Sequence, residues 1–122
     1  MTENEPDLEA LMTVDRISFG EVMECIFDIR QHEIDTYLAL VSLPGSTVGE
    51  LASHLERDRS TVSRTLTTLL EKNLAERERR IVDGGGYVFQ YYAAPIEETQ
   101  ERMRDAVDVW VHEVHEKIDG FG

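Results

Sequence analysis

The sequence predicts a mainly α-helical domain with one small β-hairpin, and three features of the chain support this fold class. Residues 58–74 carry apolar side chains at the spacing of one helical face, and two capping boxes lie upstream of them. After residue 74 the spacing becomes alternating, with an Asp-Gly pair between two runs, which is typical of a tight turn between antiparallel strands. At 122 residues the chain can bury one core, so we expect a single domain.

The N-terminal third of the chain predicts an arm and two helices. Residues 1–14 are acidic, and we expect them to form a flexible arm. Ser18 and Glu21 form a capping box ahead of an apolar face that runs over residues 19–27. A second apolar face follows, and Pro44 with the next glycine ends that helix.

The middle of the chain predicts a helix-turn-helix. Thr47 and Glu50 form a second capping box ahead of a short helix. Asp58 is a good N-cap for a longer helix. The apolar stripe of that helix consists of Val62, Leu66, Leu69 and Leu70. We expect Asn73 to end it, because asparagine tolerates the left-handed conformation needed there, with Leu74 as the closing hydrophobic contact.

Two strand-like runs, residues 75–82 and 87–93, follow this second helix. A hairpin directly after a helix-turn-helix completes a winged helix-turn-helix domain, which we place at residues 15–94, with the hairpin as its wing. The three glycines between the strands lack the lysine and helix of a phosphate-binding loop, so we interpret them as a flexible wing tip.

The last part of the chain, residues 95–122, predicts one long helix in which Pro95 suits the first position. Its narrow apolar seam would pack better against a partner than stand alone, so we predict a dimerisation helix and a homodimer, with the first helix as a second layer. The alternative is a helix that folds back on its own domain. The candidate dimerisation residues are Phe19, Met23, Phe27, Met103, Val107, Trp110, Val114, Ile118 and Phe121.

The polar face of the helix at 58–73 is small and basic, which suits approach to phosphates and base edges. We therefore predict a DNA recognition helix that enters the major groove, and a wing that contacts the flanking backbone or the minor groove. The candidate DNA-binding residues are Arg59, Ser60, Thr61, Ser63, Arg64, Thr67, Thr68, Lys72, Arg77, Arg79, Arg80 and Gly85.

The charge distribution supports this prediction, although the formal net charge is −13. Residues 57–80 carry seven cations and four anions, a net of +3, so the other positions carry −16. A positive island favours nucleic-acid contact, although a chance cluster of solvated charges would look the same.

Of the twelve cations only Lys72 and Lys117 are lysine. With the dispersed acid surplus, this indicates a halophilic protein that works where the screening length is about 3 Å. The alternative is an acidic interaction module that binds basic proteins and never touches DNA.

The order of these motifs resembles a known group of proteins. T-V-G-E-L-A, D-R-S-T-V-S-R-T-L, N-L-A-E-R-E-R-R and G-G-G-Y follow one another as in archaeal winged-helix regulators related to the TrmB, PadR and MarR groups. The similarity is greatest to haloarchaeal members that regulate the response to reactive oxygen species. The resemblance implies a dimeric, sequence-specific transcription regulator without catalysis, acting on a pseudo-palindromic operator. It also implies DNA contacts at the wing arginines and at Arg59, Ser60, Thr61, Ser63, Arg64 and Thr67.

Other candidate sites are weaker. Cys25, the single cysteine, excludes an intramolecular disulfide and is the candidate redox residue, but a structural thiol fits its apolar neighbours better. His112, His115 and Glu116 share a helix face that a metal could use, but solvated histidines explain them as well, and we predict no metal site.

The remaining expectations are absences. No residue pattern indicates an enzyme, and the sequence does not identify a small-molecule effector. We predict no cofactor, with potassium and other salt ions as the expected ligands of the acidic surface. The sequence contains neither a membrane span nor a signal peptide, so the expected location is the cytoplasm.

Overall fold

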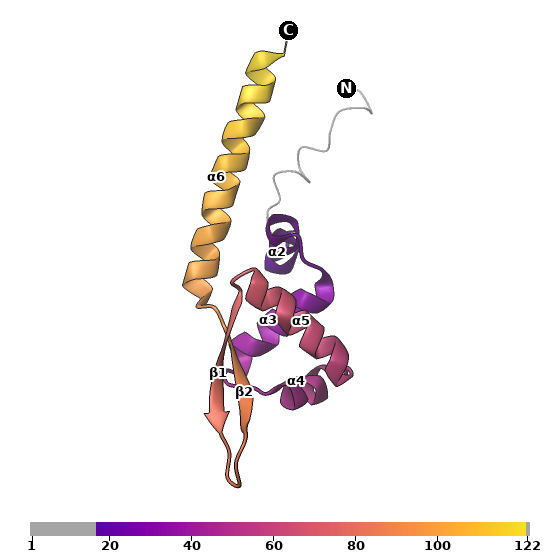
Figure 1. Cartoon of the computed structure of the whole chain (residues 1–122). Helices are drawn as coiled ribbons and strands as arrows, with labels where there is room; N and C mark the ends of the chain where they lie inside the picture. The colour runs from indigo at the N-terminus through magenta and orange to yellow at the C-terminus, as the bar shows by residue number, and fades with distance from the viewer. Residues whose placement is uncertain (1–16, 122) are drawn as a thin grey trace.

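The computed structural model describes residues 17–121, and the predicted arm at residues 1–14 lies outside them. The described chain forms five helices and a two-stranded antiparallel sheet (Figure 1). The elements are α2 (Phe19–Phe27), α3 (Gln31–Ser42), α4 (Val48–Leu55), α5 (Arg59–Glu71), β1 (Ala75–Ile81), β2 (Tyr87–Ala93) and α6 (Ile96–Gly120). This order confirms the predicted fold class. None of the described helices is long and apolar enough to cross a membrane.

The helix ends follow the capping residues of the sequence. The Ser18 hydroxyl accepts from the Glu21 backbone N–H at 3.0 Å, and Thr47 accepts from Glu50 in the same way at 3.2 Å. Asn73 takes the left-handed conformation with φ of 59°. The next N–H, that of Leu74, donates back to the Leu69 carbonyl at 2.9 Å, which completes a Schellman motif at the end of α5. Both predicted capping boxes and the predicted helix end are therefore confirmed.

Helix α3 lies at the centre of the hydrophobic core. Ile34, Tyr37 and Leu40 are fully buried, and α3 packs against both α5 and the hairpin. The Tyr37 hydroxyl donates to the Ala94 carbonyl oxygen at 3.3 Å and lies 2.9 Å from Thr99 Oγ1. This buried polar contact joins α3 to the start of α6, and burial raises the pKa of Tyr37.

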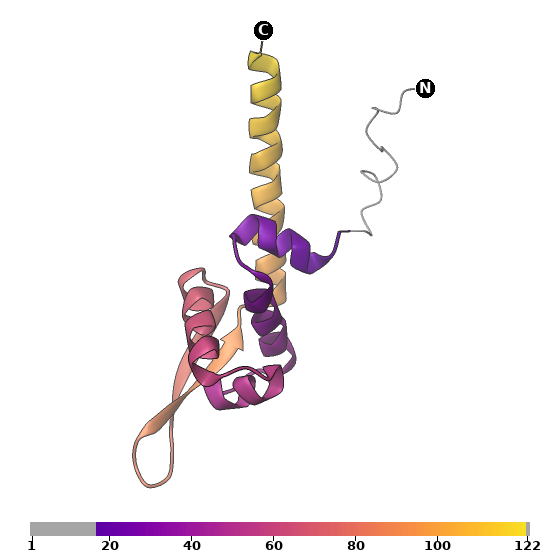
Figure 2. The ribbon, with the colours of Figure 1, turned by 90° about the vertical axis from the view of Figure 1, so that its right-hand side faces the viewer.

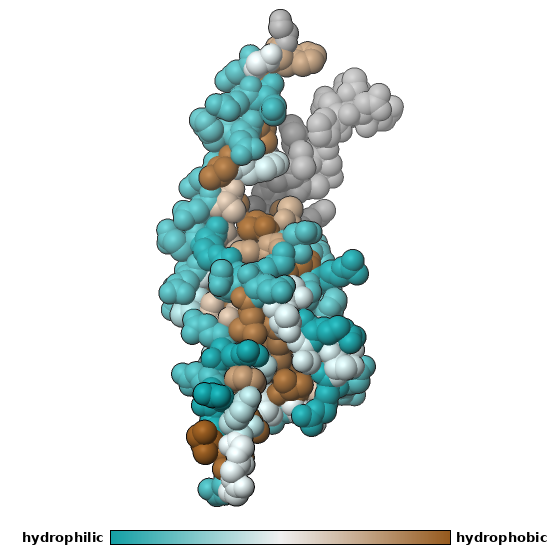
Figure 3. All heavy atoms as spheres, viewed as in Figure 1, coloured by the Kyte–Doolittle hydropathy of each residue, from teal (hydrophilic) through white to brown (hydrophobic). Residues whose placement is uncertain are grey.

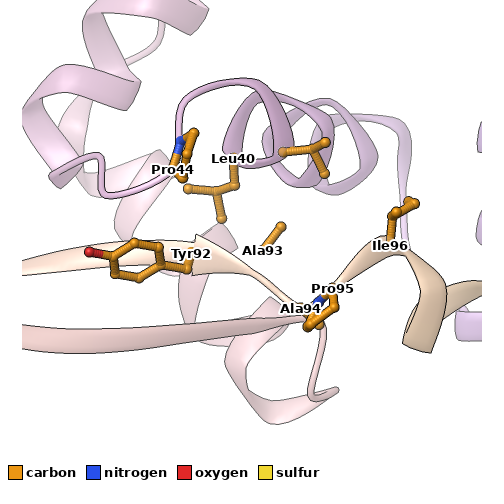
Figure 4. Close-up of a pocket in the computed structure, with 8 residues that line it drawn as sticks. Leu40, Pro44, Tyr92, Ala93, Ala94, Pro95 and Ile96 are labelled. Atoms are coloured by element: carbon orange, nitrogen blue, oxygen red, sulfur yellow. The ribbon is translucent and has the colours of Figure 1, made fainter.

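The hairpin is attached to the helices by a short backbone bridge. The Tyr91 N–H donates to the Ser46 carbonyl at 2.8 Å, and the Gly45 N–H donates to the Tyr91 carbonyl at 2.9 Å. Gly45 has a φ of +83°, a conformation that favours glycine. Figure 4 shows Leu40 of α3 and Ala93 of β2 pointing into the space between the two elements, where they fix the base of the wing.

Helix α6 begins one residue later than predicted. Pro95 has ψ of 135° and is the N-cap, so the first helical residue is Ile96. The extended conformation of the proline turns the chain out of β2 before the helix starts. α6 then packs on α2 near its first turns and projects away from the body, as both ribbon views show (Figures 1 and 2).

Candidate nucleic-acid interface

The packing of α5 determines which of its side chains face outward. Val62, Leu66 and Leu69 are buried in the core, and Thr65 is buried with them. The opposite face carries the exposed side chains Arg59, Ser60, Ser63, Arg64 and Thr67. All of these were predicted from the sequence as DNA contacts, and the structure brings them together on one face of the first two and a half turns of α5.

The amino end of α5 is organised around Asp58. Its carboxylate accepts the Thr61 N–H and the Ser60 hydroxyl, both at 2.7 Å, and the Thr61 hydroxyl at 3.0 Å. The hydroxyl of Ser60, followed by the bonds from Thr61, lowers the pKa of Asp58 to about 2. In the free protein, the hydroxyls of Ser60 and Thr61, both predicted DNA contacts, therefore donate to the N-cap carboxylate of Asp58.

The two arginines of this face lie on either side of the cap. Arg64 Nη2 lies 3.4 Å from Thr61 Oγ1, close to the helix surface. The Arg59 guanidinium lies against Gly49 in the first turn of α4, where an added Cβ would stand 3.4 Å from Nη1. The amino ends of α4 and α5 thus present one surface with two permanently charged donors.

Two predicted contacts do not belong to this face. Lys72 donates its ammonium group to the Phe27 carbonyl at 2.8 Å, at the carboxyl end of α2. Thr68 is half-buried, donates to the Arg64 carbonyl at 3.3 Å, and borders a small depression beside Glu33. The exposed residue near the end of α5 is Glu71, an anion. The side of α5 that can approach a phosphate backbone is therefore its amino-terminal part, and Lys72 is a structural cation.

The three wing arginines lie on two different faces of the hairpin. Directly paired residues of antiparallel strands point to the same side, and Arg77 pairs with Tyr91 while Arg79 pairs with Phe89. The Arg77 guanidinium lies over the Phe89 ring at 4.0 Å, and that of Arg79 lies over the Tyr87 ring at 5.0 Å.

The opposite face of the hairpin is acidic. It carries Arg80 with Glu76 and Glu78, whereas the face of Arg77 and Arg79 has no acidic residue between Ala75 and Ile81. Ala75 and Tyr91 on the arginine face are buried against the helices. We call this the arginine–aromatic face of the wing, and it lies on the side of the hairpin that faces the helical body.

The tip of the wing is an open loop. Gly84, Gly85 and Gly86 all have positive φ, and nothing lies within 4 Å of a Cβ added to any of them. Figure 2 shows this tip and α5 on the same side of the molecule, away from the free end of α6. The predicted recognition helix and wing can therefore contact one duplex together.

A second surface lies between α2 and α6. Val22, Cys25 and Ile26 of α2 face Ala106, Val107 and Trp110 of α6 across an apolar groove of about 530 Å³. We call it the α2–α6 groove. The rest of the α6 seam stays uncovered by the described residues, with Trp110 66% and Ile118 64% exposed. Phe121, predicted as the last seam residue, follows the end of the helix at Gly120 with an extended backbone and is 90% exposed. Figure 3 shows hydrophobic patches on this projecting part of the helix.

Three of the predicted dimerisation residues make contacts within the chain itself. Met23 is 0% exposed and Met103 is 6% exposed, because both fill the core of the protomer where α6 crosses α2. Phe27 is half-buried under the guanidinium of Arg102. The first part of the predicted seam therefore packs within the chain, and the remainder stays a predicted dimer contact.

The remaining candidate sites are exposed side chains. Cys25 is exposed at the rim of the groove. His112 Nε2 lies 3.3 Å from Glu116 Oε2 on the surface of α6. Over residues 17–121, no three side chains of the types that bind metals come together.

The depressed pKa of Asp58 yields a pH test. Asp58→Asn keeps an N-cap acceptor but removes the titrating carboxylate. The folded pKa of about 2 lies below the ordinary 3.8, so the charged cap stabilises the fold above about pH 4, and this contribution disappears as the pH falls toward 2. In urea titrations, we expect the stability difference between wild type and Asp58→Asn to shrink across that window. A difference that is independent of pH would contradict this role of the cap.

Comparison with known proteins places the chain in a family. Residues 23–97 match the family described as sugar-specific transcriptional regulator TrmB. The uncharacterized protein MJ1503 of Methanocaldococcus jannaschii is 28% identical over 102 residues, which cover 84% of this chain and 77% of that protein.

Two solved structures show the same fold. A possible transcriptional regulator from Methanosarcina mazei Go1 superposes with a TM-score of 0.75 at 22% identity, covering 83% of this chain and 86% of that one. FabT of Streptococcus pneumoniae, solved in complex with DNA, superposes with a TM-score of 0.52 at 20% identity, covering 94% of this chain and 74% of FabT. The chain is a winged-helix protein that belongs to the TrmB family of transcriptional regulators.

Proposed function

We propose that the protein is a sequence-specific DNA-binding transcription regulator that acts as a homodimer. The amino-terminal half of α5 enters the major groove, and the wing, residues 75–93, contacts the flanking backbone or the minor groove. The observation that carries this proposal is the outward face of α5, where small hydroxyls and two arginines are exposed around the N-cap Asp58. Family membership and the DNA complex of FabT support it.

The parts of the interface have different tasks in this proposal. Arg64, Ser63 and Thr67 read base edges, because they lie on the most exposed line of α5. Arg59 and the arginine–aromatic face bind phosphates, since Arg59 lies beside Gly49 at the amino end of α4 and the wing guanidiniums lie over the rings of β2. Arg80, on the acidic face of the hairpin, contributes less.

The uncovered seam of α6 supports a homodimer. The seam continues from the buried Met103 through Val107 and Trp110 to the exposed Ile118, at a spacing that suits another helix. A second copy would cover the groove and seam together. Two recognition helices would then reach successive major grooves, about 34 Å apart, on a pseudo-palindromic operator.

The acidic surface suits a halophilic cytoplasm. With a formal charge of −13, the body would repel DNA at low ionic strength, but at molar salt the repulsion acts only within about 3 Å. The alternative, a winged-helix interaction module that binds proteins and not DNA, is favoured by the same charge. A mobility-shift assay at molar potassium chloride separates the two, because only the DNA-binding protein shifts a duplex there.

The biological signal in this proposal is oxidative stress, and it rests on the sequence resemblance to haloarchaeal regulators such as RosR. Cys25 at the rim of the groove is the side chain with redox chemistry. The proposal specifies neither a small-molecule effector nor the sign of regulation.

The first prediction concerns base reading. Arg64→Ala should weaken binding to the cognate duplex by on the order of 1–3 kcal/mol, because it removes a bidentate donor from the groove. Arg104→Ala is the matched control, since Arg104 is an exposed arginine on α6, paired with Glu101. Fluorescence anisotropy at molar potassium chloride measures both. Equal affinity of the two variants would remove Arg64 from the interface.

The second prediction concerns the dimer. Trp110→Glu places a charge on the exposed seam and should convert the dimer into a monomer in sedimentation velocity at molar potassium chloride. Val109→Glu adds the same charge to the same helix about 140° from the centre of the seam and should stay dimeric. A monomeric wild type would contradict the dimer, and a dimeric Trp110→Glu would place the interface elsewhere.

The third prediction concerns the signal. Genome-wide occupancy should change when cells are exposed to peroxide, and the change should persist in Cys25→Ser if this thiol is structural. Loss of the response in Cys25→Ser would make Cys25 the sensor. Occupancy that is identical with and without peroxide would contradict the proposed role in oxidative stress.

A further inference from the structure

Arg102, a residue of α6, reaches across to the end of α5. Its Nη2 donates to the Lys72 carbonyl at 2.8 Å, and its Nη1 donates to the Asn73 carbonyl at 2.9 Å. The Schellman motif has already used the carbonyls of Leu69 and Leu70. Arg102 therefore satisfies two further acceptors, the carbonyls of the C-cap Lys72 and of Asn73, and it places a cation at the pole where the helix dipole favours one.

The same guanidinium also contacts α2. It lies over the Phe27 ring with 4.8 Å between the guanidinium carbon and the ring centroid, and Phe27 is the last residue of α2. Lys72 at the end of α5 donates to the Phe27 carbonyl at 2.8 Å. The carboxyl ends of α2 and α5 thus meet at Arg102, and each helix end receives a cation.

The contacts of Arg102 with the carboxyl ends of α2 and α5, which we call the Arg102 junction, connect the α2–α6 groove with the recognition helix. Arg102 precedes Met103, which is buried in the core, and Val107 lies just over one turn further along in the α2–α6 groove. At its other end the junction holds the carboxyl end of α5. α5 has 13 residues and is about 20 Å long, so a tilt of about 10° at this end would move its amino end by about 3 Å. A displacement of that size breaks hydrogen bonds to bases.

We propose that Arg102 is a positioning residue that sets the spacing of the two recognition helices on DNA. This inference rests on the proposed dimer and its DNA-binding role. In a dimer joined through α6, the distance between the two copies of α5 depends on the angle between α6 and α5 in each protomer. The guanidinium of Arg102 fixes that angle, because two hydrogen bonds to the end of α5 and the contact with the Phe27 ring constrain the guanidinium plane.

A half-site spacing assay tests this role. Two duplexes are compared at molar potassium chloride: one recovered by in vitro selection with the wild type, and the same duplex with one base pair inserted at its centre. The insertion displaces one half-site by about 3.4 Å and rotates it by about 35°. The wild type should discriminate strongly against the insertion.

Arg102→Gln should bind the selected duplex roughly tenfold more weakly and should lose most of this discrimination, because its α5 can adapt to the altered spacing. Binding to random duplex should be unchanged. Arg104→Gln removes the same charge from a position two residues further along α6 and should behave as wild type. Arg102→Lys keeps the charge without the planar fork, and we expect intermediate discrimination. It also provides the test if Arg102→Gln does not fold.

The outcomes separate this inference from the proposed function. A wild type that binds no duplex overturns both. A dimeric Arg102 variant that binds the selected duplex with full discrimination overturns the positioning role alone. A variant with weaker binding to every duplex but unchanged discrimination shows a contribution of charge or stability and likewise overturns it.

Discussion

The packing of one stripe of α5 against α3 is the interaction on which the other features depend. Val62, Leu66 and Leu69 are buried against a helix whose own Ile34, Tyr37 and Leu40 have no exposed surface. Because this contact fixes the rotation of α5 about its axis, it also fixes which side chains face away from the core. The same α3 receives the hairpin and, through Tyr37, the start of α6. One central helix thus orients the exposed face of α5, the wing and α6 relative to one another.

Electrostatics act at short range in this molecule. The positive groups of the interface are few, and three of them lie against a local contact: Arg59 against Gly49, Arg77 over Phe89 and Arg79 over Tyr87. Alternation along β1 separates these wing cations from Glu76 and Glu78, which face the other side of the hairpin. Where salt screens long-range attraction, such preorganised contacts are the contribution that persists.

Local sequence signals predicted the helices and strands. They did not predict which side chains meet across the fold, because those contacts join residues far apart in the sequence. The two capping boxes, Asn73 and the Asp-Gly turn encode their own geometry, so helix and strand bounds followed from a few residues each. Lys72 was assigned to DNA because it lies on a basic stretch, but its four-carbon chain reaches back to Phe27. Arg102 went unnoticed because its acceptors lie 29 and 30 residues away. Likewise, a helical seam predicts apolar contact without specifying the contacting surface, which is why Met23 and Met103 were assigned to a partner.

Hydrogen–deuterium exchange of the wild-type protein at molar potassium chloride, with and without a duplex recovered by in vitro selection, tests the central claim most directly. The claim is that the amino-terminal half of α5 and the arginine–aromatic face of the wing form one DNA interface. It predicts that duplex slows exchange in α5 and in the wing from Arg77 to Phe89, and leaves the projecting half of α6 unchanged. Recovery of no duplex, or protection confined to α2 and α6, would contradict it.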